Sequence, residues 1–359
     1  MSGIQSPVRF RPDIETPEPD EGETADGLNR TFDIILDRTA EDYGHAVRAV
    51  HAKAHAILEG ELSIDADLPP ELAQGLFARP GTHKVLMRLS TNAGDILPDA
   101  ISLPRGLAIK VLDVDGERLE GAEGRTQDFI MVNAPVFAAP DAGKFLGNLK
   151  LLAKTTDRLE GTKKVLSAVL RGVNTALGSV GLESGAIASL GGAPNSEPLG
   201  ETYYSATPFR YGDYIAKFSL APVAPAMTAL TGHTIDIDGR ENAIREDLRA
   251  EMREIDAQWE FRVQLCRDLE RQPIEDATVT WDEQEAPYRK VGTLRAAAQD
   301  SWSPEKVQAV DEGMRFSVWT GLAAHQPLGG VNRARRSAYQ HSAAFRARTN
   351  GCPLHEPAG

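Results

Sequence analysis

The sequence is poor in cysteine, and its two cysteines, Cys266 and Cys352, lie far apart in the 359-residue chain. A disulfide framework needs more cysteines at closer spacing, so we expect an ordinary hydrophobic core and a reducing compartment. A chain of this length buries such a core without covalent help. The length is compatible with two domains or with one large barrel carrying helices.

Long apolar runs and an excess of positive charge are also missing. No run of 18 apolar residues occurs, and the N-terminus lacks the basic and then apolar pattern of a secretory signal. The formal net charge of −13 disfavours nucleic acid and anionic membranes as partners. We therefore expect a soluble protein of the cytoplasm.

Composition divides the chain into three parts. Residues 1–30 carry several prolines and acidic residues, which predicts a flexible N-terminal arm. Residues 31–348 are expected to form one folded domain, and residues 349–359 a short C-terminal tail. Helices are predicted where apolar residues recur at helical spacing or where a capping serine precedes a proline, namely at 41–50, 142–190, 241–255 and after Ser303-Pro304.

Much of the remaining sequence alternates between apolar and polar residues, which is typical of strands. The predicted strands are 85–90, 107–112, 129–133, 214–220, 259–265, 278–281 and 288–294. Short strands at this frequency, separated by Gly, Pro and Asp, indicate an antiparallel sheet that closes or nearly closes. The glycine- and proline-rich stretch 185–200 is expected to be a loop.

The most informative pair of residues is Arg335 and Tyr339, near the C-terminus. On a helix, a spacing of four places both side chains on one face. A phenol alone is a poor metal ligand because it loses its proton only at about pH 10. A guanidinium within hydrogen-bond reach favours the phenolate, and tyrosine is one of the proximal ligands of haem iron. By itself the pair is also compatible with an ordinary helix surface.

Four motifs follow one another in the first half of the chain: RAVHAK at 48–53, MRLSTNAGD at 87–95, PRGLAIK at 104–110 and DFIMVNAPVF at 128–137. Together with Arg335 and Tyr339, they resemble in kind and order the signatures of the haem catalase family. The chain is similar to a short catalase-related protein, of the minimal catalase or peroxidase-like kind. The similarity is dense over about 48–145, sparse until 291, and renewed over 316–346.

The resemblance implies an α+β fold, with an antiparallel eight-stranded β-barrel of catalase type surrounded by α-helices. Haem b would lie between the inner wall of the barrel and the C-terminal helix. It would be held without a covalent link, because neither cysteine belongs to a Cys-x-x-Cys-His attachment motif. The implied haem-binding residues are the iron ligand Tyr339 with its partner Arg335, the propionate-binding Arg48, Arg88 and Arg346, and the apolar Val50 and Phe145.

The resemblance also implies three catalytic residues. His51 would be the distal base that moves a proton between the peroxide oxygens, and Ser90 would fix its tautomer. Asn133 would orient the peroxide. Counted back from Pro135 without gaps, however, the asparagine of the family falls on Val132. Either a small shift brings Asn133 into the pocket, or the distal amide is missing, which would suit bulkier or more apolar peroxides.

Other residues permit simpler interpretations. His51 and His55 are four apart, but the zinc protease motif needs a glutamate after its first histidine, and here Ala52 follows. His325 is expected to lie in a loop. Gly329-Gly330 is expected to form a turn into a helix and not a phosphate-binding loop, because no strand precedes it.

The function implied by the resemblance is a haem-dependent peroxidase with possible weak catalase activity. It would reduce hydrogen peroxide or organic hydroperoxides through a ferryl intermediate, with an organic electron donor as second partner. One alternative is rearrangement of fatty-acid hydroperoxides, as in allene oxide synthases. Another is a haem- or lipid-binding barrel without turnover. A homo-oligomer, dimer or tetramer, is expected by resemblance alone.

Overall fold

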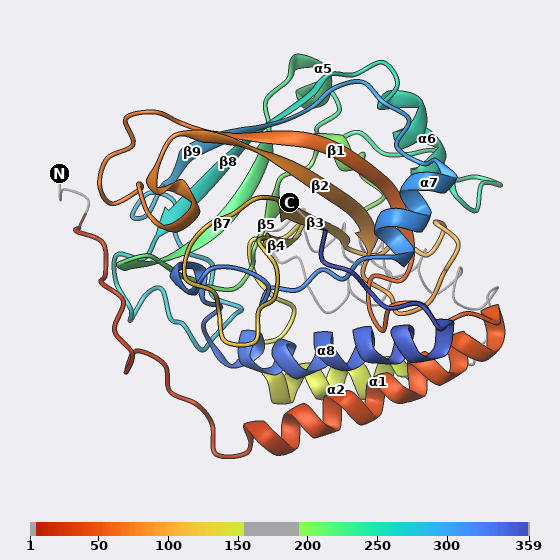
Figure 1. The fold of residues 1–359 in the computed structure, drawn as a ribbon, viewed down its shortest axis with the longest axis horizontal. Coiled ribbons are helices and arrows are strands. Elements are labelled where there is room, and N and C mark those ends of the chain that lie inside the picture. Colours follow the sequence, from red (N-terminus) through yellow and green to blue (C-terminus); the bar gives the residue numbers. More distant parts are fainter. Residues whose placement is uncertain (1–4, 154–193, 358–359) are drawn as a thin grey trace, which may run out of the picture.

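The computed structural model describes residues 5–153 and 194–357 of the chain. Within these residues the strands form one antiparallel sheet in the order β5-β4-β3-β2-β1-β9-β8-β7-β6 (Figure 1). The strands are β1 (Ala54–Ile64), β2 (Gly81–Thr91), β3 (Arg105–Val111), β4 (Gln127–Val132), β5 (Tyr203–Tyr204), β6 (Phe209–Tyr211), β7 (Tyr214–Pro222), β8 (Ala257–Leu265) and β9 (Tyr288–Ala296).

The sheet closes on itself through the short strand β5. Tyr204 pairs with Val132 of β4 on one side, and Tyr203 and Tyr204 pair with Leu220 and Ser219 of β7 on the other. The closed ring therefore contains eight antiparallel strands, and β6 is an additional strand paired with β7 outside the ring. The predicted eight-stranded antiparallel barrel is confirmed.

Six of the seven predicted strands coincide with observed ones. The exception is 278–281, which is irregular. Its apolar residues pack without strand pairing: Trp281 is buried in a small cluster with Ile215 and Leu328, and the carbonyl of Val279 accepts a hydrogen bond from Lys217. Apolar residues at alternate positions can thus belong to a loop that covers the barrel.

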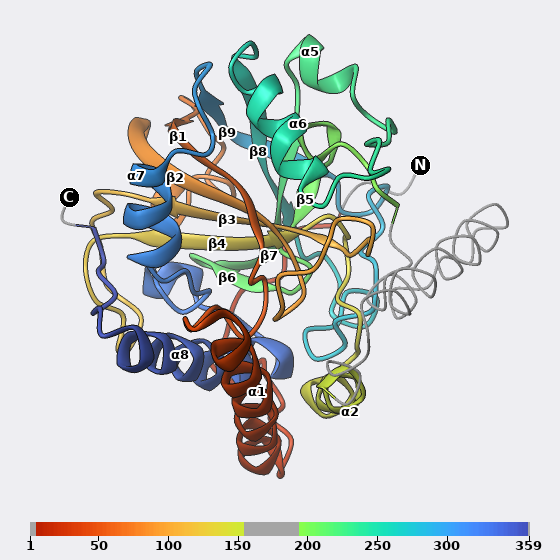
Figure 2. The same cartoon turned by 90° about the vertical axis from the view of Figure 1, so that its right-hand side faces the viewer.

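Three helices form a layer along one side of the barrel (Figures 1 and 2). They are α1 (Glu21–Tyr43), α2 (Ala142–Ala153) and α8 (Gly330–Asn350), and α1 packs against both others. The layer has its own apolar cluster, which contains Leu28, Phe32 and Leu36 of α1 and Leu149 of α2. This layer brings α8, which carries Arg335 and Tyr339, against the barrel.

The N-terminal segment differs from the predicted arm. Helix α1 begins at Glu21, so the last ten residues of the expected arm are helical, and Gly44 caps its end in a left-handed conformation. The buried residues of α1 recur at helical spacing, a pattern that the acidic composition obscures. Residues before α1 also touch the body of the protein, since Arg9 forms a bridge with Tyr214 and Glu15 pairs with Arg333.

The expected helix at 41–50 is absent: α1 ends at Tyr43, and the chain then runs without regular structure until β1. The other helices agree better with the prediction. Helix α6 (Ala243–Glu251) buries Ile244 and Leu248, and α7 (Pro304–Lys306) is capped by the Ser303 hydroxyl, which accepts a hydrogen bond from the Lys306 N–H. A π-helical turn, η3 (Val307–Glu312), follows directly.

The short remaining helices are η1 (Gly75–Ala78), η2 (Pro198–Gly200), α5 (Pro225–Thr228) and η4 (Ala323–His325). Of the predicted helix 142–190, the part after residue 153 lies outside the described residues, as do residues 185–193 of the predicted loop. Gly329 has a positive φ of 87° and directly precedes α8, as the predicted turn requires. In the two described ranges, no helix is both long enough and apolar enough to span a lipid bilayer.

His325 lies in the barrel core and not in an exposed loop. Its ring is fully buried among Phe77, Phe129, Tyr211 and Phe218, at centroid distances of 5.6–6.1 Å. The expected loop position is therefore only half right: the backbone belongs to the short turn η4, but the side chain fills the barrel. Burial lowers the pKa of His325 from its ordinary value of 6.5 to about 3.

This buried histidine predicts sensitivity to acid. Between about pH 6.5 and 3 the unfolded chain binds a proton at His325 that the folded chain does not, so the free energy of unfolding falls as the pH drops through this range. At pH 5 the loss from His325 alone amounts to about 2 kcal/mol. Urea unfolding at pH 7 and pH 5 measures it.

A matched pair of variants assigns the effect. In His325→Gln the amide oxygen can still accept the hydrogen bond from the N–H of Leu76 (2.9 Å to Nε2 in the native chain) without titrating. This variant should lose about 2 kcal/mol less between pH 7 and 5 than the wild type. His233→Gln, at an exposed position, should leave the pH dependence unchanged. An identical pH dependence in all three proteins would contradict the prediction.

Candidate active site

His51 lies in the loop between α1 and β1, with a positive φ of 54° that is uncommon for a residue other than glycine. Two backbone hydrogen bonds hold this loop against the turn after β2. The N–H of His51 donates to the carbonyl of Asn92 (3.2 Å), and that of Ala52 donates to Ala93 (2.8 Å). A Cβ at Gly94 would lie 2.1 Å from the carbonyl oxygen of Ala49, so this turn needs glycine.

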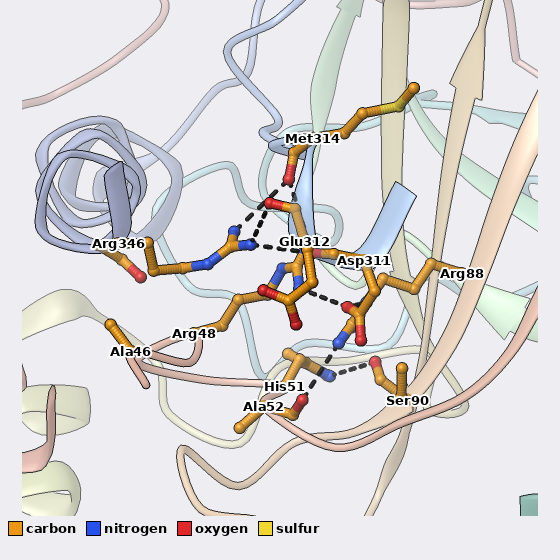
Figure 3. A network of polar contacts seen from close by, with 12 residues as sticks. Ala46, Arg48, His51, Ala52, Arg88, Ser90, Asp311, Glu312, Met314 and Arg346 are labelled. Atoms are coloured by element: carbon orange, nitrogen blue, oxygen red, sulfur yellow. Dashed lines mark hydrogen bonds and ion pairs between the residues drawn. The ribbon is translucent and has the colours of Figure 1, made fainter. Parts of the chain in front are cut away.

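The imidazole of His51 packs on the sheet beside Ser90. Its Nδ1 is 3.0 Å from the Ser90 hydroxyl (Figure 3), and a Cβ at Gly106 of β3 would lie 2.3 Å from its Cε1. Burial, followed by the charges of Arg88, Arg335 and Arg48, lowers the pKa of His51 to about 3. The ring is therefore neutral at physiological pH and can accept a proton from a ligand.

These residues lie on the outer face of the barrel. Ser90 pairs with Gly106, and Gly106 with Val132, so the three residues share one face of β2, β3 and β4. Their neighbours Leu89 and Leu107 point to the opposite face and belong to the core inside the barrel. The site is thus between the outer wall of the barrel and the helical layer. The position predicted from the sequence, at the inner wall, is wrong.

Arg48, Arg88 and Arg346 converge next to His51 (Figure 3). They come from the loop after α1, from β2 and from α8, and all three meet the π-helical turn η3. The Asp311 carboxylate accepts hydrogen bonds from Arg48 Nη1 (2.5 Å) and Arg88 Nε (2.8 Å). The structure thus brings together three arginines that the sequence interpretation had grouped, and it adds Asp311, which that interpretation did not identify.

Backbone carbonyls satisfy other N–H groups of the cluster. Arg346 Nη2 donates to the carbonyls of Asp311 (2.9 Å) and Glu312 (3.0 Å), and Arg48 Nη2 donates to that of Met314 (3.1 Å). Arg88 Nη2 donates to the carbonyl of Ala52 (3.3 Å). A small cavity of about 50 Å³ borders Arg48, Asp311 and Arg346.

Arg335 and Tyr339 form the expected pair on α8. Arg335 Nη2 donates to the Tyr339 hydroxyl at 2.9 Å, and Arg335 Nη1 donates to the side-chain oxygen of Asn332 at 3.1 Å. Both Arg335 and Tyr339 are partly buried, and Tyr339 packs against the barrel core. Asn332 is fully buried and also accepts a hydrogen bond from Thr207, so it fixes one end of the guanidinium.

Val50 and Phe145 both lie in the apolar cluster of the helical layer. Phe145, on α2, contacts Phe137 with tilted rings whose centroids are 5.2 Å apart. Val50 immediately precedes His51, so the chain next to the imidazole is apolar. Val50 is thus adjacent to the candidate site, and Phe145 belongs to the helical layer that covers it.

Asn133 does not join the other candidate residues. Its side-chain oxygen accepts the N–H of Arg105 (2.8 Å), and its amide donates to the Glu201 carboxylate (2.9 Å). Along β4 the residue on the face of His51 is Val132. Of the two alternatives, the geometry favours a missing distal amide, with Val132 in its place.

His51 and His55 do not form a metal pair. His55 is buried in β1, and its Nε2 lies 3.4 Å from the Thr91 hydroxyl. Burial keeps the pKa of His55 well below its usual range. Across the described ranges, no group of three or more histidine, cysteine, aspartate or glutamate side chains is placed to hold a metal ion.

Comparison with solved structures identifies this architecture. Catalase A from Saccharomyces cerevisiae has a TM-score of 0.57 and 15% identity over 95% of this chain and 67% of that chain. A fungal catalase has a TM-score of 0.56 and 17% identity over 97% of this chain and 69% of that chain. A bacterial catalase has a TM-score of 0.57 and 16% identity over 99% of this chain and 67% of that chain. No protein-family profile and no curated protein sequence matches the chain. The chain therefore has the catalase-type fold, as the motif resemblance implied.

Proposed function

We propose that this protein is a haem-dependent peroxidase that reduces hydrogen peroxide or organic hydroperoxides. One observation carries the proposal. Arg335, which holds the Tyr339 hydroxyl, is close enough to His51 for its charge to contribute to the lowered pKa of the imidazole. A candidate iron ligand on α8 and a neutral base in the loop before β1 therefore lie near each other.

The charge of the site is compatible with haem b. Three buried or nearly buried guanidiniums surround the Asp311 carboxylate, and Glu312 also acts on Arg48 and Arg346, so positive charge remains in excess. After burial itself, the charges of Arg88 and Arg346 are the main reason why the pKa of Arg48 lies well below its usual value. Two propionate carboxylates would balance this excess, and guanidinium–carboxylate pairs are strong. Arg48, Arg88 and Arg346 would hold the propionates, with Val50 and Phe145 against the porphyrin.

Each part of the proposed reaction is assigned to particular residues of the chain. Haem, when bound, would supply the iron at which the O–O bond is cleaved. Tyr339, polarised by Arg335, would offer its phenolate oxygen to that iron. If Nδ1–H of His51 donates to Ser90, Nε2 is free to accept the proton of the hydroperoxide and to return it to the leaving oxygen, which departs as water or an alcohol. An organic donor would supply the two electrons of the reduction.

The distal side favours substrates with an apolar substituent. His51 has Val50 beside it in the chain and Val132 across Gly106, while the amide of Asn133 is engaged elsewhere. Hydrogen peroxide would therefore have one polar partner, the imidazole of His51, and would lack a second one, the distal amide. We propose organic hydroperoxides as the better substrates, with weak catalase activity.

Hemin titration of the purified protein tests the proposal. A saturable spectrum of a ferric haem with an oxygen ligand should appear, and the loaded protein should consume cumene hydroperoxide faster than hydrogen peroxide when an organic donor is present. Rearranged product from a fatty-acid hydroperoxide without donor consumption would support an allene-oxide-synthase-like enzyme. Haem binding without any peroxide consumption would support a carrier.

The variant Val132→Asn tests the origin of the substrate preference. It places an amide on the face of β4 that faces His51, and it should raise the ratio of hydrogen peroxide to cumene hydroperoxide turnover by about tenfold, the effect of about one additional hydrogen bond. Asn133→Ala is the matched control and should leave that ratio unchanged. A change in the ratio with Asn133→Ala alone would show that Asn133 faces the substrate.

We also propose that the haem domain includes residues 31–348, that the protein is cytoplasmic and that it forms a homo-oligomer. The domain contains the barrel, the arginine cluster and most of α8. Gel filtration with light scattering would measure the oligomeric state directly.

A further inference from the structure

The turn η3 brings one carboxylate and several carbonyls to the arginine cluster. π-helical turns are rare and occur frequently at functional sites. Here the turn places the Asp311 side chain on Arg48 and Arg88, and the carbonyls of Asp311 and Glu312 on Arg346. The following residues are also fixed, because the Gly313 carbonyl accepts the N–H of His355 (2.8 Å). The turn is therefore held from both sides.

Asp311 is the only carboxylate that contacts these arginines among the described ion pairs. The neighbouring Glu312 carboxylate pairs with His45 Nε2 (2.7 Å), is 31% exposed, and forms no described ion pair with the three arginines. Burial, the largest single influence, would raise the pKa of Asp311, but Arg88 and Arg48 together lower it to about 2. Asp311 is therefore ionised at neutral and mildly acidic pH.

Without Asp311, three guanidiniums would repel one another in a site largely closed to water. Removing one member of a buried ion pair is strongly destabilising, because the remaining charge is left without compensation. An incoming ligand with two carboxylates would supply the missing charge. The same substitution should therefore harm the ligand-free protein far more than the loaded one.

We propose that Asp311 is a stand-in carboxylate, built into the η3 turn, that keeps Arg48, Arg88 and Arg346 together while no anionic ligand is bound. It stabilises the ligand-free state, and its negative charge competes with that of an incoming anionic ligand. The inference rests on the proposed function only where it names hemin as the ligand.

The test compares the wild type, Asp311→Asn and Glu312→Gln, each without and with saturating hemin, by thermal unfolding. In the ligand-free form, Asp311→Asn should lower the Tm by about 5–15 °C, whereas Glu312→Gln should lower it by no more than about 2 °C. Hemin should raise the Tm of Asp311→Asn more than that of the wild type. By linkage, the hemin Kd of Asp311→Asn should be lower than that of the wild type.

Two results would overturn the proposal. The first is a ligand-free Tm of Asp311→Asn within about 2 °C of the wild type. The second is a hemin Kd raised by tenfold or more, which would make Asp311 part of the loaded site. If Asp311→Asn does not fold alone, the double variant Arg48→Met/Asp311→Asn, which removes one of the repelling charges, should fold, and its failure would also count against the proposal. Lack of hemin binding by the wild type would instead refute the proposed function.

Discussion

Replacing Tyr339 with phenylalanine is expected to abolish axial coordination of haem while leaving the protein folded. Phenylalanine keeps the aromatic ring that packs against the barrel core, and it removes only the hydroxyl that accepts the hydrogen bond from Arg335. Loss of residues that merely support a metal ligand costs about 10–100-fold in affinity, so loss of the ligand itself should cost at least about 100-fold. Hemin titration followed by absorption spectroscopy measures both the affinity and the ligand type.

The control for Tyr339→Phe is Tyr43→Phe. Tyr43, at the end of α1, is 42% exposed and donates its hydroxyl proton to Asp95 at 2.5 Å. The same atom is thus removed from a tyrosine whose hydroxyl bonds to Asp95 and Ile96, neither of which is a proposed haem-binding residue, and hemin binding should not change. If Tyr339→Phe bound hemin with an unaltered spectrum, the axial ligand would have to be sought elsewhere in the chain.

Replacing His51 with alanine is expected to slow the reaction of the hemin-loaded protein with peroxide by about 10²–10⁴-fold, the usual contribution of a general acid–base group. The imidazole is the proposed proton carrier, and its partner Ser90 alone cannot accept and return the proton. Stopped-flow absorption spectroscopy measures the rate. Hemin affinity should change much less, because His51 is hydrogen-bonded neither to Tyr339 nor to the guanidiniums of the arginine cluster in the described hydrogen bonds.

The pH dependence of this reaction provides an independent check. Burial and the neighbouring arginines hold the pKa of His51 at about 3, so the imidazole stays unprotonated as the pH falls from 8 to 5. The rate should therefore show no loss centred near pH 6.5, which is where an exposed histidine titrates. His233→Ala, at an exposed position, should match the wild type in rate and pH profile. A wild-type rate that falls with an apparent pKa near 6.5 would contradict the assignment.

The parts of the site that could be predicted from the sequence are those fixed by short-range geometry. Arg335 and Tyr339 are one helical turn apart, and any helix brings them together. The alternation of β2 and β3 likewise determines that Ser90 and Gly106 share a face. The motif resemblance then supplied the remaining step, the meeting of His51 with Ser90.

Asp311 could not be predicted in this way. In the sequence it is one of two adjacent acidic residues in a helical stretch, a pattern typical of an exposed surface. Its role depends on the extra residue in a π-helical turn and on contacts with two segments more than 200 positions away. The orientation of Asn133 could not be predicted either. Side chains alternate between the two faces of a strand, so a shift of one residue decides whether Asn133 faces His51 or Arg105.

The closure of the barrel has a consequence for how the protein fails on heating. The ring is joined between β4 and β7 by the two residues of β5 alone, whereas β1 and β2 are paired over ten positions. The pairing of β5 with β4 and β7 should therefore break first on heating. The opened barrel would then present two unpaired strand edges to neighbouring molecules. Edges of this kind recruit further strands, so we expect heated solutions to lose protein by intermolecular β-sheet growth before the helical layer unfolds.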